Sequence, residues 1–152
     1  MKIRTDYVTN SSSSSFILGF TNEDNIKYEL VDGFNSWEME YFSEVFSDVQ
    51  EAQRLTKEEV IDKFYDELEW EAGYAIARKK GIDPWRNWHW RENDEIQELI
   101  KEEIDKMISD RQYMFDKFSV FVEVEYSDHD RSELEHEVMP NHKSCIICFN
   151  HH

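Results

Sequence analysis

The spacing of hydrophobic residues changes twice along this chain, and this change constrains the fold more than any other feature. Near both ends, apolar residues alternate with polar ones, which is typical of strands with one face in water. In the middle they recur every three or four residues, which is typical of amphipathic helices. Strands, then helices, then strands again predict an α+β fold: a small mixed or antiparallel sheet with three main helices packed on it.

Four segments are predicted to be strands. They lie near residues 15–20, 26–31, 118–126 and 144–149. The third has the clearest pattern, because every second residue from Phe118 to Tyr126 is apolar while Glu123 and Glu125 fall on the opposite face. The second is predicted from the alternation of Ile26, Tyr28 and Leu30 with charged residues, and the polar residues before it favour a hairpin with the first strand.

Three main helices are predicted between these strands. They lie near residues 37–53, 57–80 and 94–111. The second has the best end signals, since Thr56 and Glu59 match a capping box and Gly81 follows its basic last turn. A further short helix is predicted over residues 132–139, ending at Pro140.

The length and composition favour one domain over residues 1–152. The chain is 39% apolar and 14% aromatic, so it can bury a single core. Two cysteines do not make a disulfide framework, and the first apolar run is too short for a secretory signal or a membrane span. A cytoplasmic protein with reduced thiols is therefore expected.

The net charge of −17 limits the partners of the chain. Nucleic acids and anionic membranes would be repelled, whereas cations and basic proteins would be attracted. Acidity is also common as a means of staying soluble. A further hypothesis is that the chain mimics a nucleic acid and occupies the binding site of a DNA-binding protein. Whether the chain is a monomer or a homodimer stays open.

The two ends of the chain carry a family resemblance. The chain opens with Lys2-Ile3-Arg4-Thr5-Asp6-Tyr7-Val8-Thr9-Asn10, five serines and Phe16, and it closes on His151-His152. This resembles a set of small uncharacterised bacterial proteins, mostly from Gram-positive species, that open with KIRTDFVTNSSSSSF and end in His-His. The resemblance covers both ends and little of the middle. It implies membership of that family but no activity, because none is established for it.

The serine run is the first candidate site. It consists of Asn10, Ser11, Ser12, Ser13, Ser14 and Ser15. Its ordinary interpretation is a surface turn that leads into the first strand. It can also be a loop that holds an anion, although no glycine-rich phosphate loop accompanies it. A third hypothesis packs the serines against His136 and the terminal histidines through hydroxyl–imidazole hydrogen bonds.

The second candidate is a metal site near the C-terminus, where five of the six histidines and both cysteines follow residue 128. The candidate ligands are Asp128, His129, Asp130, His136, His151 and His152. This set suits a divalent metal such as zinc or manganese, and a metal-bound water would make the protein a hydrolase. Cys145 and Cys148 are predicted to be core residues on opposite faces of a strand, so only a bulge would let them share a metal.

The third candidate is an aromatic surface. It comprises Trp85, Arg86, Trp88 and Trp90. Aromatic residues and arginine anchor interfaces, although such rings also simply cover a helical layer. The sequence has no nucleophile elbow, phosphate loop or metalloprotease motif. The preferred function is therefore a non-catalytic module that binds a protein partner or a small ligand through this surface or the serine run, with the metal-dependent protein as the alternative.

Overall fold

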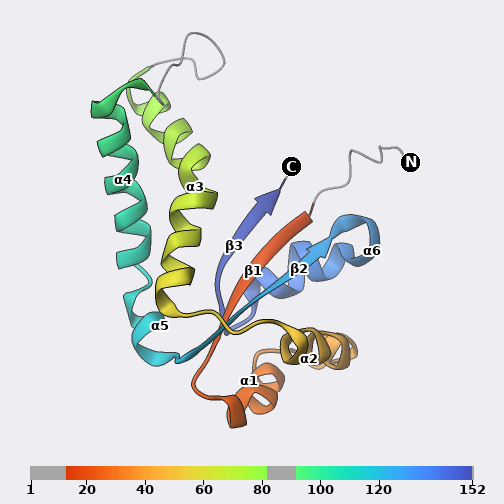
Figure 1. Cartoon of the computed structure of the whole chain (residues 1–152). Coiled ribbons are helices and arrows are strands. Elements are labelled where there is room, and N and C mark those ends of the chain that lie inside the picture. The colour runs from red at the N-terminus through yellow and green to blue at the C-terminus, as the bar shows by residue number, and fades with distance from the viewer. Residues whose placement is uncertain (1–12, 82–91, 152) are drawn as a thin grey trace. The chain divides into compact units, whose positions relative to one another are not determined.

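A computed structural model of the chain describes residues 13–81 and 92–151, and of residues 128–130 and 151 it describes the backbone alone (Figure 1). The fold is α+β, as predicted. The strands are β1 (Ser13–Phe20), β2 (Val120–Ser127) and β3 (Cys145–His151). The α-helices are α1 (Ile26–Asp32), α2 (Phe42–Glu51), α3 (Lys57–Lys79), α4 (Asp94–Ser109), α5 (Gln112–Lys117) and α6 (Asp128–Glu133).

The three strands form one antiparallel sheet in the order β2-β1-β3. The central strand β1 therefore pairs on both sides, and Phe16 lies opposite Val124 in β2 and Cys148 in β3. Three of the four predicted strands are confirmed, with bounds that shift by a few residues. The pairing of Ser13 with His151 places the last three serines of the run beside the end of β3.

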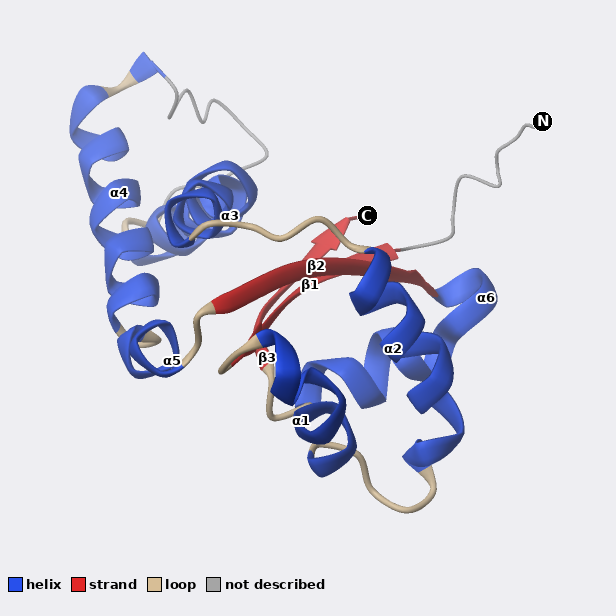
Figure 2. Cartoon of the chain, turned by 60° about the horizontal axis from the view of Figure 1, so that its bottom comes forward, coloured by secondary structure: helices blue, strands red, loops and turns tan. Residues whose placement is uncertain are grey.

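One face of the sheet carries a hydrophobic core. Phe16, Leu18 and Phe20 from β1 are fully buried there, against Val122 and Val124 of β2. Helices α1 and α2 cover this face, as does the helical segment that follows β2 (Figure 2). Their contribution to the core consists of Ile26, Leu30, Val45, Val49, Leu134, Val138 and Met139.

The predicted strand over residues 26–31 is wrong, because this segment is helix α1. Asn22 caps the turn before it by accepting a hydrogen bond from the Asn25 backbone N–H at 2.9 Å. Ile26 and Leu30 are buried, but Tyr28 is 72% exposed, which fits a helix whose apolar face repeats every four residues. The predicted hairpin is therefore replaced by a strand followed by a helix.

The predicted helices are confirmed with changes at their ends. A 3-10 turn over Glu38–Tyr41 precedes α2, so the helix predicted near residues 37–53 is shorter than expected. The short helix predicted near residues 132–139 is part of a longer helical segment. It comprises α6, a π-helical turn over Leu134–Val138 and a 3-10 turn over Met139–Asn141.

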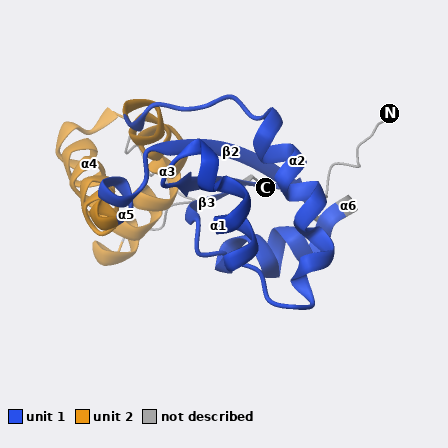
Figure 3. Cartoon of the chain, turned by 90° about the horizontal axis from the view of Figure 1, so that it is seen from below, with its two compact units in different colours: residues 1–57, 114–152 blue, residues 58–113 orange. Residues whose placement is uncertain are grey.

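The chain divides into two compact units, residues 1–57 with 114–152 and residues 58–113 (Figure 3). The second unit is a helical hairpin of α3 and α4, in which Lys79 and Glu103 form an ion pair at 3.8 Å. Its buried stripe repeats every four residues, as the sequence predicts. It contains Val60, Phe64, Leu68, Ala72, Ile76, Ile96, Ile100 and Ile104. The expectation of a single domain over residues 1–152 stays a prediction.

Candidate binding groove

Two adjoining cavities run along β2 on the side of α2, and we call them together the α2–β2 groove. One has a volume of about 320 Å³ and the other of about 270 Å³. Asp48 and Glu125 line both cavities, so the two lie next to each other. The full lining is Glu44, Asp48, Glu51, Ala52, Glu123, Val124, Glu125, Tyr126, Ser127 and Arg131.

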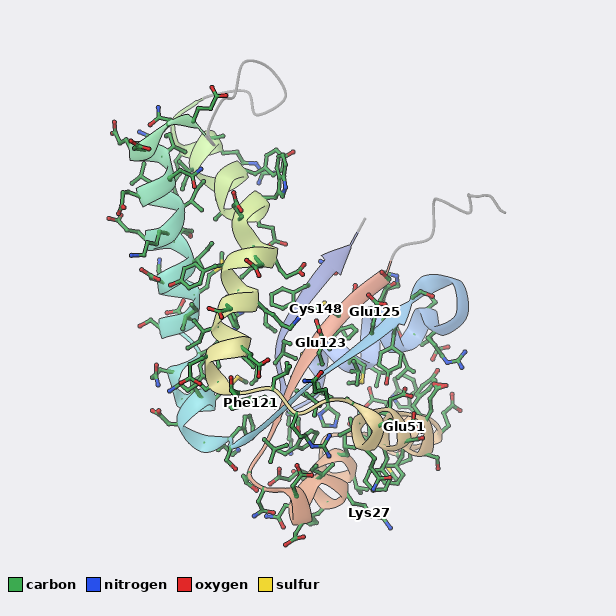
Figure 4. All side chains as sticks on the ribbon, viewed as in Figure 1. Lys27, Glu51, Phe121, Glu123, Glu125 and Cys148 are labelled. Atoms are coloured by element: carbon green, nitrogen blue, oxygen red, sulfur yellow. The ribbon has the colours of Figure 1, made fainter. Side chains whose placement is uncertain are left out.

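Negative charge dominates this groove, since five of its residues carry carboxylates and one carries a guanidinium. The guanidinium is already neutralised, because Arg131 Nε lies 2.6 Å and 2.8 Å from the two carboxylate oxygens of Glu44. Figure 4 shows Glu123 and Glu125 along β2 and Glu51 on α2. The carboxylates come from both walls, so a cation in the groove would meet negative charge on two sides.

One hydrogen bond joins the two walls of the groove. The Tyr126 hydroxyl donates a hydrogen bond to Asp48 Oδ2 at 2.9 Å, joining β2 to α2. Burial, and then the Asp48 carboxylate, raise the pKa of this tyrosine far above its ordinary value. The tyrosine therefore stays neutral and keeps donating, which fixes the position of the Asp48 side chain beside β2.

A second polar cluster joins the two ends of the chain. Ser14, from the serine run, is buried, and its hydroxyl oxygen lies 2.9 Å from Oε2 of the buried Glu135 and 2.9 Å from Oδ1 of Asn150. A hydroxyl has one hydrogen, so Ser14 donates to one of these oxygens at a time. The exposed His136 places Nε2 2.9 Å from the other oxygen of Glu135.

The hypothesis of hydroxyl–imidazole hydrogen bonds is wrong for Ser14 and His136, because the Ser14 hydroxyl and the His136 imidazole each contact the carboxylate of Glu135 instead. A serine nucleophile needs a base on its own hydroxyl and an orienting group behind that base. Here the imidazole contacts the carboxylate instead. The arrangement fits a structural link between β1, β3 and the π-helical turn.

The cysteines differ from the prediction. The register of β1 with β3 shifts between Ile17 and Leu18, so Cys148 lies opposite Phe16 and Cys145 lies opposite Leu18. Both cysteines pack against the same core cluster and are partly exposed. The prediction of opposite faces is wrong, because it assumed a regular strand and β3 contains a bulge or similar irregularity.

Most of the predicted metal ligands fall outside the described side chains. This holds for Asp128, His129, Asp130, His151 and His152, whereas His136 is described and contacts Glu135. Among the side chains that the structure does describe, no three from histidine, cysteine or acidic residues group as metal ligands. The metal site stays a prediction.

The aromatic surface and part of the serine run also lie outside the part of the chain that the structure describes. Trp85, Arg86, Trp88 and Trp90 lie outside the described residues, as do Asn10, Ser11 and Ser12. The remaining serines, Ser13 to Ser15, belong to β1. Partner binding at the tryptophans stays a prediction, and the ordinary interpretation of the run as a turn applies at most to the residues before Ser13.

His142 is a structural histidine that the sequence did not single out. It is 4% exposed, its Nε2 lies 2.9 Å from the carbonyl oxygen of Leu30, and the Ser144 backbone N–H donates to Nδ1 at 3.0 Å. These partners assign the neutral form with the hydrogen on Nε2. The ring also packs edge-on against Phe34, at 4.8 Å between centroids.

We expect His142 to make the protein less stable in mild acid. Burial lowers the pKa of His142 below its ordinary 6.5, and the Leu30 carbonyl and the charges of Glu38 and Asp32 offset only part of this, with Lys143 adding to the lowering. Between the folded and the unfolded pKa, this imidazole therefore carries a proton in the unfolded chain but not in the folded chain. The stability that depends on neutral His142 should be fully present above about pH 6.5. As the pH drops below that value, the free energy of unfolding should decrease, by at most about 1.4 kcal/mol per pH unit.

Urea unfolding between pH 5 and 8 measures this slope. The variant His142→Gln should be less stable overall but should lose part of the slope, since glutamine does not titrate. His136→Gln is the matched control, because His136 is 53% exposed. Equal slopes in the wild type and the His142→Gln variant would contradict the assignment.

No known protein family model matches this chain, and neither a curated protein nor a solved structure matches it. None of the described helices is long and apolar enough to cross a membrane. Among the described residues, the α2–β2 groove is the cavity that gathers carboxylates from two elements, and it is the candidate site.

Sequence reasoning missed this groove. Glu123 and Glu125 were expected on the polar face of their strand, and acidic residues are too common in this chain to stand out. The signal lies in their combination with Asp48 and Glu51, which the sequence separates by more than 70 residues. Only the packing of α2 beside β2 brings the two sets together.

Proposed function

We propose that the chain is a non-catalytic binding module whose α2–β2 groove binds a cationic segment of a partner protein. The observation that supports this most is the lining of the groove. Besides the Glu44–Arg131 ion pair it contains four carboxylates on two walls, those of Asp48, Glu51, Glu123 and Glu125. Attraction between opposite charges speeds association and favours partners whose charge is opposite to that of the groove. The net charge of −17 adds a long-range field of the same sign.

The shape of the groove favours an extended segment over a small molecule. Neither cavity alone is large by the standard of small-molecule pockets, and both are open and polar rather than enclosed and apolar. Together they follow β2 from Glu123 to Ser127. A chain of several residues can lie along this length and place a basic side chain near each pair of carboxylates.

Fluorescence anisotropy with labelled peptides tests this proposal. A ten-residue peptide rich in lysine and arginine should bind, and its affinity should fall as salt rises, because the groove charges are partly exposed to solvent. A peptide of the same length with glutamate at those positions should not bind. Absence of binding by the basic peptide at low salt would overturn the proposal.

The triple variant Glu51→Gln/Glu123→Gln/Glu125→Gln should weaken binding of the basic peptide about tenfold, since each exposed charge pair contributes up to about 1 kcal/mol. The control is Glu58→Gln/Glu95→Gln/Glu98→Gln, which removes the same charge from exposed positions on α3 and α4. Anisotropy titration of both variants separates a local site from general attraction. An equal loss in both would place the binding outside the groove.

A further inference from the structure

The strand that lines the groove is an edge strand. In the sheet order β2-β1-β3, β2 pairs with β1 on one side only. Its outer side carries one isolated bridge among the described residues, between Leu55 and Phe121 at the start of the strand. The rest of β2, from Glu123 to Ser127, is where the groove lies.

The direction of the backbone groups along β2 follows from that bridge. The Leu55 N–H donates to the Phe121 carbonyl at 2.8 Å, so the polar groups of Phe121 point away from β1. In an antiparallel strand this direction alternates from residue to residue. The N–H and C=O of Glu125 and Ser127 therefore also point outward, toward the groove, while those of Val124 and Tyr126 point toward β1.

The carboxylates flank this edge on both faces of the sheet. Val122 and Val124 belong to the core face, on which α2 also packs, so Asp48 and Glu51 lie on that side of the edge. Glu123 and Glu125 alternate with these valines and therefore project from the opposite face. A strand laid beside β2 would find negative charge above and below it.

We propose that the cationic segment binds as a fourth strand, added to the edge of β2 beside Glu125 and Ser127. This inference rests on the proposed function, because it specifies how the partner occupies the same groove. Hydrogen bonds from the outward backbone groups would hold the segment, as in other cases of strand addition. Basic side chains on both of its faces would meet the carboxylates, so neighbouring lysines or arginines are accommodated.

A second copy of this chain is a poor occupant of the same edge. Pairing two β2 strands would bring Glu123 and Glu125 close to the same residues of the other copy, and like charges on paired strands destabilise the pairing. Charged side chains at an edge are a known means of preventing such self-association. The charge pattern therefore favours a basic partner.

Two N-methylated forms of the basic peptide test the inference. In an added strand, every second peptide N–H points toward β2, and the N–H groups between them point away. Methylating two N–H groups that point inward should weaken binding about tenfold, because two backbone hydrogen bonds to β2 are lost. Methylating the two intervening groups is the matched control and should leave the affinity nearly unchanged.

Hydrogen exchange of the full chain gives an independent measure. Binding of the unmodified peptide should protect the backbone amides of Glu125 and Ser127 more than amides elsewhere in β2. If the peptide binds but both methylated forms bind alike and these amides stay unprotected, strand addition is wrong and the proposed function stands. If no basic peptide binds, both fail. Protection of the same amides in a peptide-free dimer would overturn the choice of occupant.

Discussion

Replacing Phe16 with alanine is expected to lower the free energy of unfolding by about 4 kcal/mol. Phe16 is fully buried in the central strand, between Val124 and Cys148, and its ring lies 6.2 Å from that of Tyr126. Alanine would remove apolar contacts with both neighbouring strands and leave a cavity that the sheet cannot close without bending. Urea denaturation followed by circular dichroism measures this loss.

The matched control for Phe16 is Tyr28→Ala, which removes an aromatic ring of similar size from a side chain that is 72% exposed. This change should alter the free energy of unfolding by no more than about 0.5 kcal/mol. A loss comparable to that of Phe16→Ala would mean that Tyr28 packs in a core. It would then support the strand predicted over residues 26–31 and contradict helix α1.

The elements with a long, consistent hydrophobic period were predictable from the sequence. The stripe of α3 repeats every four residues from Val60 to Ile76, while the residues midway between its first members, Asp62 and Asp66, are charged. A strand would place these two aspartates on the apolar face, so the pattern predicts a helix. The alternation in β2 from Val120 to Tyr126 is equally one-sided. Where the period is sustained, local preference and tertiary burial agree, so the α+β class follows without knowledge of the packing.

Short elements with few buried residues were not predictable in this way. In α1 the buried residues Ile26 and Leu30 are four apart, and this spacing places them on one face of a helix and also on one face of a strand. Only Tyr28 separates the two possibilities, since a strand would place it on that face and a helix does not. Tyrosine is common in strands, so its type favoured the wrong answer.

The candidate site was even less predictable from the sequence. The irregularity in β3 that moves Cys145 and Cys148 to one face has no signal in the residues between them. The α2–β2 groove needs α2 to pack beside the edge of the sheet, and Glu135 reaches Ser14 only because β1 and the π-helical turn meet. Each depends on contacts between segments that are distant in the chain, which periodicity does not report.

Replacing Gly33 with alanine is expected to lower the free energy of unfolding by about 3 kcal/mol, although alanine has the higher helix propensity. The backbone is not the reason, because φ at Gly33 is −85°. A Cβ at this position would overlap the imidazole of His142. The ring is buried and bonded to Leu30 and Ser144, so moving it would break one or both hydrogen bonds.

A double-mutant cycle isolates this overlap. His142→Ala alone should also destabilise, because it leaves a cavity and two backbone groups without their partner. In the double variant the new methyl group would occupy part of the space left by the ring. The combined loss in urea denaturation should therefore be smaller than the sum of the single losses, by about 2 kcal/mol.

The control for this cycle is Gly81→Ala, since Gly81 has a positive φ of 70° and no atom close to its missing Cβ. That variant should lose about 1 kcal/mol from backbone strain alone. Its loss should simply add to that of His142→Ala, because a Cβ at position 81 would meet no atom within 4 Å. Additive losses for Gly33→Ala as well would show that Gly33 and His142 do not touch, and the packing of α1 against the segment before β3 would then be wrong.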